Sequence, residues 1–138
     1  MLNLNKINSG RFLPANKATL CMLKAAESYL TWGYASLKTV QNLIYKRGYA
    51  NIRSQRLAIS SNELIARHLQ QFGVVCVEDL VHEIYTVGPA FKHCNKFLDT
   101  FHLNAAKKGI VSKKKHFCNG GDFGNRESYI NPLVNRML

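Results

Sequence analysis

Residues 43–57, LIYKRGYANIRSQRL, are the stretch around which the rest of this chain is organised. Apolar residues at helical spacing lead up to Gly48, so the stretch predicts the end of an amphipathic helix and then a turn. Cations and aromatic rings gather here, at Lys46, Arg47, Arg53 and Arg56 and at Tyr45 and Tyr49. Such side chains suit phosphates and bases, but Lys and Arg also suit an ordinary helix C-terminus. The stretch alone supports a polyanion site and a solvated helix end equally.

The charge of the whole chain favours the polyanion site. Its 138 residues carry 19 Lys and Arg against 8 Asp and Glu, a formal net charge of +11. In a chain of one-domain length, this excess indicates a polyanionic partner, nucleic acid before an anionic membrane surface. The excess lies in residues 1–62 and 100–138, which flank a mildly acidic middle, residues 63–99. We expect RNA-facing flanks and a middle that supplies core and protein contacts.

Patterns of catalysis and metal binding are weak. His82 and Glu83 begin like the zinc motif HExxH, but the fifth position is Thr86, so the second histidine ligand is missing. The loop GGDFGNRE, residues 120–127, is neither a Walker loop nor a GxGxxG motif, and a tight helix entry explains it better than a phosphate cradle. The four cysteines stand alone, without CxxC spacing, which favours a reducing compartment. We expect no catalytic residue, no metal and no cofactor, and no run approaches a membrane span.

Hydrophobic periodicity predicts a helix-rich chain with short strands. Helices are expected over residues 17–32, with Asn16 as the cap, and over 37–47, 63–72, 78–87, 91–98 and 129–137. Ser60 and Glu63 have the spacing of a capping box. Pro132 either delays the start of the last helix or kinks it. Short strands are expected at 11–13, around 57–59 and near Phe117.

Four strings go beyond composition and periodicity. They are TWGYASLKTVQNLIYKRGY (31–49), LAISSNELIARHL (57–69), FGVVCVEDLVHEIYTVGPAF (72–91) and HFCNGGDFGNRESYIN (116–131). In this order they resemble the universal ribosomal protein L-thirty family, specifically its eukaryotic branch, known as L-seven. The resemblance runs from about Lys6 to Met137, and LIYKRGY, EDLxHEIYTVG and GGDxGNRE are its specific motifs.

The resemblance implies an α+β fold, a small antiparallel sheet packed by several helices, in a single domain over residues 1–138 with a basic arm at 103–121. The family's long N-terminal extension and first strand have no counterpart here. The resemblance therefore implies an N-terminally truncated or partial copy, whose sheet lacks its first strand.

The resemblance also implies a structural constituent of the large ribosomal subunit, without catalysis or cofactor. Such a protein binds rRNA and neighbouring ribosomal proteins, supports subunit assembly and translation, and has no membrane or small-molecule partner. It would reside in the cytoplasmic ribosome after nucleolar passage. The alternative is a biogenesis factor of the same family that acts on pre-rRNA in the nucleolus, against which the YKRGY and EIYTVG strings argue.

The family motifs and the basic arm together give the residues expected to face rRNA. These are Lys46, Arg47, Tyr49, Arg53 and Arg56 around the YKRGY turn, Lys107, Lys108, Lys113, Lys114 and Lys115 in the basic arm, and Asn125 and Arg126 at the GNRE helix entry.

Overall fold

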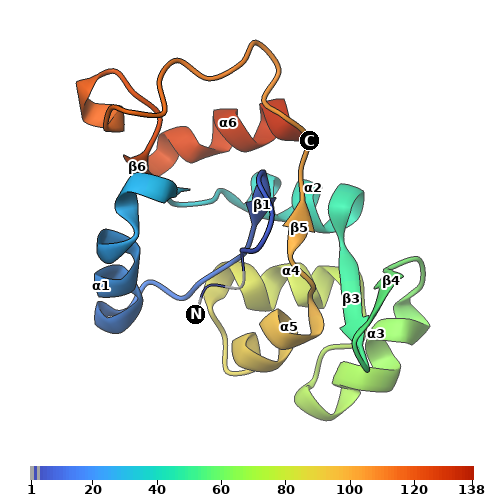
Figure 1. The fold of residues 1–138 in the computed structure, drawn as a ribbon. Helices are drawn as coiled ribbons and strands as arrows, with labels where there is room; N and C mark the ends of the chain where they lie inside the picture. Colours follow the sequence, from blue (N-terminus) through green and yellow to red (C-terminus); the bar gives the residue numbers. More distant parts are fainter. Residues whose placement is uncertain (1, 3) are drawn as a thin grey trace. The chain divides into compact units, whose positions relative to one another are not determined.

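The computed structural model describes residue 2 and residues 4–138 (Figure 1), and the chain divides into two compact units. Unit 1 comprises the described residues up to Phe12, residues 37–103 and Leu138. Unit 2 comprises residues 13–36 and 104–137. Each unit joins segments that are far apart in the sequence. The single domain expected over residues 1–138, with its arm at 103–121, stays a prediction.

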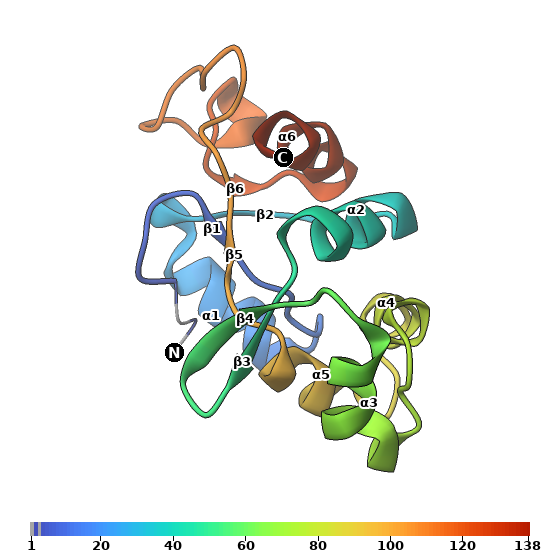
Figure 2. The same cartoon turned by 90° about the vertical axis from the view of Figure 1, so that its right-hand side faces the viewer.

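Unit 1 contains four α-helices and two antiparallel strand pairs. Its elements are β1 (Ser9–Gly10), α2 (Leu37–Arg47), β3 (Tyr49–Ile52), β4 (Gln55–Ala58), α3 (Asn62–Leu69), the 3₁₀ helix η2 (Gln70–Phe72), α4 (Val77–Thr86), α5 (Phe91–Phe97) and β5 (Phe101–His102). α4 packs on α2 and on α5, and α5 also packs on α3 and β3 (Figure 2). The helices expected over 37–47, 78–87 and 91–98 are therefore confirmed to within a residue or so at each end.

The core of unit 1 is made by the apolar faces of these helices. Val40, Leu43 and Ile44 of α2 are buried, and so are Leu80 and Ile84 of α4. Each set follows helical spacing, which is why the two helices pack along one stripe. The buried α2 residues come immediately before the cationic turn, so the core fixes where that turn begins.

Gly48 ends α2 for a steric reason. Its N–H donates to the carbonyl of Ile44 at 2.9 Å, and a Cβ at this position would lie 2.1 Å from that same oxygen. Only glycine allows this close approach of the backbone. The turn predicted at Gly48 is therefore confirmed.

Unit 2 contains two α-helices and one parallel strand pair. Its elements are α1 (Lys17–Ala25), the 3₁₀ helices η1 (Glu27–Tyr29), η3 (Phe117–Asn119) and η4 (Glu127–Tyr129), the strands β2 (Thr31–Trp32) and β6 (Gly124–Asn125), and α6 (Ile130–Met137). Asn16 caps α1, because its Oδ1 accepts from the N–H of Thr19 at 2.9 Å. α6 begins at Ile130, which places Pro132 in the first turn, where the missing N–H costs nothing.

Several predicted boundaries are wrong. The helix expected to reach residue 32 ends at Ala25, because Thr31 and Trp32 pair with β6 instead. The capping box expected at Ser60 does not form: α3 begins at Asn62, and its N-cap residue Ser61 makes no side-chain capping bond. The strand expected near Phe117 is a 3₁₀ turn that Gly120 closes in the left-handed region.

The sheets are small and separate. β1 pairs with β5 and β3 with β4, both antiparallel, whereas β2 pairs with β6 in parallel. The strand expected at residues 11–13 lies earlier, at Ser9–Gly10. The α+β class is confirmed, but the expected single antiparallel sheet is divided into pairs, one of them parallel. No helix in the described part of the chain is long and apolar enough to cross a membrane.

Candidate nucleic-acid interface

The cationic stretch after Gly48 forms a β-hairpin in unit 1. β3 and β4 pair from Tyr49 with Ala58 to Ile52 with Gln55. Arg53 and Ser54 form the connecting turn with φ values of 48° and 65°. Positive φ at both central residues is the geometry of a type I′ turn, whose twist matches that of the strands. The strand expected around residues 57–59 is thus β4, which ends one residue earlier and belongs to a hairpin with Arg53 in its turn.

The five predicted residues around this hairpin are placed differently. Lys46 and Arg53 are exposed, and neither side chain has a partner among the described residues. Arg47 donates from Nη2 to the carbonyl of Leu138 at 3.2 Å. Arg56 pairs with Asp99 through Nε and Oδ2 at 3.2 Å, and its guanidinium lies 4.1 Å from the centroid of the Tyr49 ring. Lys46 and Arg53 are thus the freest cations of the stretch.

Arg56 of the hairpin also affects a histidine of β5. Burial, and then the charges of Arg56 and Lys6, lower the pKa of His102 in β5. Burial and a nearby cation both disfavour the charged form of a histidine, which is why the pKa falls.

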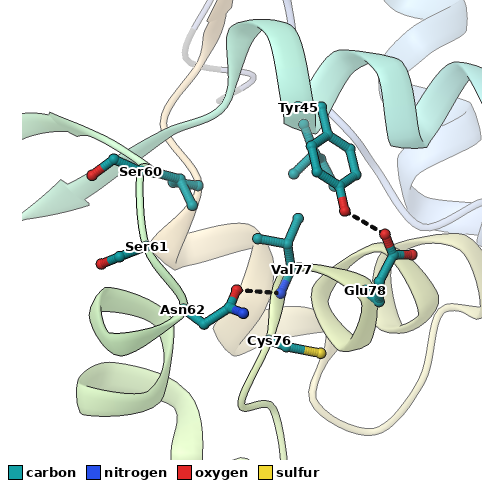
Figure 3. A pocket seen from close by; sticks show the side chains of 9 residues that line it. Tyr45, Ser60, Ser61, Asn62, Cys76, Val77 and Glu78 are labelled. Carbon is teal, nitrogen blue, oxygen red and sulfur yellow. Dashed lines mark hydrogen bonds between the residues drawn. The ribbon is translucent and has the colours of Figure 1, made fainter.

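A pocket close to this stretch has a different character (Figure 3). It lies between the end of α2, residues 59–62 and the start of α4, and Glu78 is the charged residue among those that line it. The hydroxyl of Tyr45 donates to Glu78 Oε1, and this bond raises the pKa of Tyr45. An acidic rim repels phosphate, so the pocket is not part of a polyanion site.

The other predicted lysines lie on loops of unit 2. Lys107 and Lys108 are exposed on a turn, and the Lys107 N–H donates to the carbonyl of Arg136 at 3.0 Å. Lys113, Lys114 and Lys115 are exposed on what we call the lysine loop, residues 112–115. The structure thus places these five predicted lysines on the surface of unit 2, without ion-pair partners among the residues it describes.

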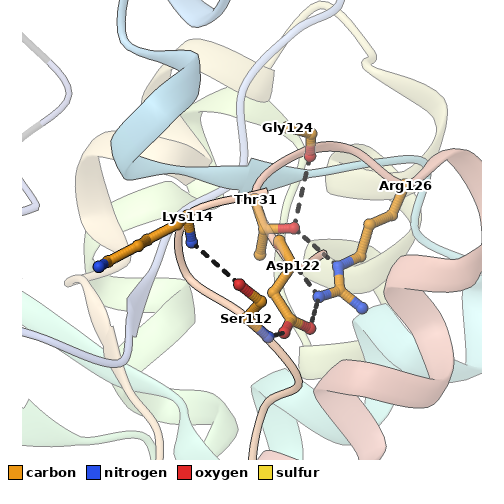
Figure 4. Close-up of polar contacts among 6 residues, drawn as sticks. All are labelled: Thr31, Ser112, Lys114, Asp122, Gly124 and Arg126. Carbon is orange, nitrogen blue, oxygen red and sulfur yellow. Dashed lines mark hydrogen bonds and ion pairs between the residues drawn. The ribbon is translucent and has the colours of Figure 1, made fainter. Parts of the chain in front are cut away.

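Asp122 bonds to the lysine loop at its first residue (Figure 4). The Ser112 N–H donates to Asp122 Oδ2 at 2.7 Å, and the Asp122 N–H donates to the carbonyls of Ser112 and Lys115 at 3.0 and 3.1 Å. The Lys114 N–H also points to Ser112 Oγ, at 3.4 Å. Both ends of the loop are therefore bonded to one residue.

Arg126 lies inside unit 2 rather than on its surface. Its side chain is 6% exposed and pairs with Asp122 Oδ1. Nε donates to Thr31 Oγ1 at 2.9 Å, and the guanidinium lies 4.8 Å from the centroid of the Phe117 ring. From the sequence, Arg126 was expected to face rRNA. Because its guanidinium is enclosed by Asp122, Thr31 and Phe117, a role in stabilising unit 2 fits it better. Asn125 is half-buried, and its Oδ1 accepts from the Glu127 N–H at 2.8 Å.

Asp122 is the residue that sequence reasoning missed. Burial alone raises the pKa of its carboxyl, but the hydrogen bonds from Ser112 and Arg126 and the charge of Arg126 outweigh burial and lower it. The spacing of Asp122 and Arg126, four residues apart, was the available signal. Thr31 lies 95 residues from Arg126, and no local pattern connects them.

Most of the acidic side chains have a partner within the described residues, although Glu63, Glu78 and Glu127 lie at the surface. Their partners are His116 for Glu27, Arg67 for Glu63, Tyr45 for Glu78, the Val75 and Cys76 amides for Asp79, the Ala90 amide for Glu83, Arg56 for Asp99 and Arg126 for Asp122. By contrast, no lysine side chain forms an ion pair within the described residues. The acids of the middle segment are therefore mostly paired, whereas the lysines leave the positive charge of the chain without ion-pair partners among the described residues.

Cysteine and histidine do not assemble into a site in the part of the chain that the structure describes. No group of three His, Cys, Asp or Glu residues is placed to hold a metal there. Cys21 and Cys118 are exposed and Cys94 is buried. Burial raises the pKa of the Cys94 thiol to about 11, so it is protonated at neutral pH.

Comparison with known proteins identifies relatives that match this chain over its whole length. No protein-family model matches it. Large ribosomal subunit protein uL30 of Drosophila melanogaster is 51% identical over 139 residues, which cover 100% of this chain and 55% of that protein. Large ribosomal subunit protein uL30A of Paramecium tetraurelia is 48% identical over 138 residues, which cover 100% of this chain and 56% of that protein. The chain thus spans about half the length of these curated relatives, and the resemblance to the L-thirty family is confirmed: over its whole length this chain is homologous to the uL30 proteins.

Proposed function

We propose that this chain is a structural, non-catalytic constituent of the large ribosomal subunit that binds rRNA through basic surface segments. Relatives at about half identity are named large ribosomal subunit proteins, which supports a place in the ribosome. Neighbouring large-subunit proteins are its other proposed partners. It supports subunit assembly and translation in the cytoplasm and passes through the nucleolus while the subunit is assembled.

The separation of charge carries the proposal. Seven of the eight acids have an intramolecular partner, while the lysines are exposed without ion pairs among the described residues. Counterions collect around such a surface and rRNA, and binding releases them, which makes association favourable at low salt. The residues we assign to this contact are Lys46 and Arg53, with Arg47, Tyr49 and Arg56 close to them in the sequence, and in unit 2 Lys107, Lys108, Lys113, Lys114 and Lys115.

Salt dependence tests the proposed binding. Affinity of the 138-residue chain for purified large-subunit rRNA, measured by filter binding, is expected to fall by at least tenfold between about 50 and 200 mM KCl. Arg53→Ala is expected to lower the slope of log affinity against log salt by about 0.7 to 0.9. Arg67→Ala is the matched control, because Arg67 lies on α3 and pairs with Glu63. Salt-independent binding, or equal effects of the two substitutions, would contradict the proposal.

Sedimentation tests the place of binding. An epitope-tagged chain expressed in eukaryotic cells is expected in polysomes as well as in pre-ribosomal particles. Confinement to nucleolar pre-ribosomal particles would contradict a role in the translating ribosome.

A further inference from the structure

We propose that Asp122 is a positioning residue for RNA binding, which holds the lysine loop in the conformation that presents Lys113, Lys114 and Lys115 to phosphate. This inference rests on the proposed function, because it assigns how one part of that contact is prepared.

The carboxylate of Asp122 joins the loop to the interior of unit 2. Oδ2 accepts from the Ser112 N–H at 2.7 Å, and Oδ1 pairs with the enclosed Arg126 (Figure 4). Arg126 is in turn fixed by Thr31 Oγ1 at 2.9 Å. Asp122 therefore connects an exposed loop to a side chain that cannot move without disturbing β2.

The far end of the loop is fixed by close packing. Gly121 is buried, and a Cβ there would lie 1.8 Å from the carbonyl oxygen of Lys115. That carbonyl also accepts the Asp122 N–H at 3.1 Å. The three lysine backbones thus lie between two fixed points, while their side chains remain exposed.

A loop fixed in this way binds more tightly than a mobile one, because the entropy of ordering its backbone is not lost on association. Asp122 is an unexpected residue for this role. Its negative charge lies beside three lysines and, by simple electrostatics, weakens their attraction for RNA. Removing the Asp122 carboxylate should therefore weaken RNA binding if the carboxylate positions the loop, and strengthen it if only its charge matters. One substitution distinguishes the two.

Asp122→Asn is the decisive variant. Asparagine has one acceptor oxygen where aspartate has two, so it cannot place an acceptor at both Ser112 and Arg126. Its NH₂ group would instead face one of these two N–H donors. If Asp122 acts only as a charge, the substitution tightens binding. If it positions the loop, we expect binding to large-subunit rRNA to weaken by about threefold to tenfold. Glu127→Gln is the matched control: Glu127 is exposed, it has no side-chain partner among the described residues, and the change in charge is the same.

The experiment measures rRNA affinity of the full chain by filter binding for wild type, Asp122→Asn, Glu127→Gln and a triple Lys113, Lys114, Lys115→Ala variant. The amide signal of Ser112 in a ¹⁵N NMR spectrum reports the loop directly, and it is expected to move in Asp122→Asn and to stay in Glu127→Gln. The triple variant is expected to lower the salt slope by up to about two units, since each lysine contributes about 0.7. Asp122→Asn is expected to lower affinity with an unchanged slope, because its lysines are all present.

Two failures are distinguishable. If the triple variant binds like wild type, this loop does not contact rRNA, and the proposed function fails at this segment together with the inference. If the triple variant binds weakly but Asp122→Asn binds as tightly as wild type or more tightly, the inference alone is overturned. Should Asp122→Asn not fold, Asp122→Glu replaces it: this change keeps the charge, but the extra methylene displaces the carboxylate from the Ser112 N–H that it accepts. It is then expected to weaken binding by about twofold, and wild-type affinity would overturn the inference.

Discussion

Arg56 in unit 1 and Arg126 in unit 2 make the same two kinds of contact. Each pairs with an aspartate, Asp99 or Asp122, and each lies over an aromatic ring. They differ in exposure, since the side chain of Arg56 is 33% exposed and that of Arg126 is 6% exposed. The same kind of cluster, an arginine with an aspartate and an aromatic ring, is therefore part of the surface in unit 1 and part of the interior in unit 2.

This difference determines what each arginine can do. A partly exposed guanidinium keeps a face for a phosphate, and its ion pair contributes little to stability because water screens it. Breaking an enclosed ion pair lowers stability strongly, because removal of one partner leaves the other as an unpaired buried charge. A basic residue within a family motif is thus not evidence of an RNA contact until its exposure is known.

The largest contrast is expected in stability. Arg126→Ala leaves the Asp122 carboxylate without its charged partner and is expected to lower the free energy of unfolding by about 3 to 5 kcal/mol. Arg56→Ala is expected to cost no more than about 1 kcal/mol. Urea denaturation followed by circular dichroism measures both. Equal costs for the two substitutions would contradict the contrast.

The two adjacent glycines before Asp122 sharpen the account of the lysine loop. Gly121→Ala forces a Cβ against the Lys115 backbone and is expected to destabilise unit 2 by about 1 to 3 kcal/mol. Gly120 faces open space with a φ of +77°, so Gly120→Ala is expected to cost about 1 kcal/mol of backbone strain only. Thermal unfolding compares the two variants. A smaller loss for Gly121→Ala than for Gly120→Ala would show that the loop is not packed as described.

A pH titration separates Asp122 from the acids of unit 1. The folded pKa of Asp122 is lowered, so its contribution to stability is complete above the unfolded value of about 3.9 and is lost as pH falls through the folded value. Trp32 is the single tryptophan and lies in unit 2, so its fluorescence can follow unfolding by urea. Below pH 4, the urea concentration at the midpoint is expected to fall. Asp122→Asn is expected to flatten that dependence.

Asp79→Asn is the control for this titration. The pKa of Asp79 is also lowered, first by the hydrogen bond from the Val75 amide, but Asp79 lies in unit 1. The Trp32 signal of this variant should keep the acid dependence of wild type. If it flattens as much as in Asp122→Asn, the two units unfold together and the acid dependence is not specific to Asp122.

The smallest expected effect is a gain in stability at the hairpin. Ser54 has a φ of 65°, which strains any residue with a Cβ, and glycine is preferred at this position of a type I′ turn. Ser54→Gly is expected to raise the unfolding free energy by about 1 kcal/mol or less. Ser60→Gly, a loop position outside the turn, is the matched change and is expected to give no gain. A loss of stability in Ser54→Gly would argue against the turn.

The sequence predicted most of the helices, because their apolar residues follow a period that local physics fixes. α2 is an example, with Val40, Leu43 and Ile44 buried as expected. It failed where pairing partners lie far apart: Trp32 leaves a helical pattern to pair with Asn125. The hairpin was also missed, since Arg53-Ser54 lacks the Asn-Gly signature of its turn.

The candidate site was predicted in its segments more than in its individual contacts. The exposure of lysines such as Lys113 can be predicted from the sequence, because a lysine-rich loop without apolar residues stays at the surface. Arg126 carries the same charge, but Thr31 and Phe117 enclose it, and those neighbours come from tertiary structure. Charge alone could not distinguish the two.

A map of the polymer that lies against each basic segment would test the proposed RNA contacts directly. Ultraviolet crosslinking of ribosomes that contain this chain, followed by mass spectrometry, would identify the residues joined to RNA. We predict rRNA crosslinks within residues 46–56 and 107–115 and none at Arg126. Segments 46–56 and 107–115 free of RNA, or crosslinks concentrated at Arg126, would contradict the account.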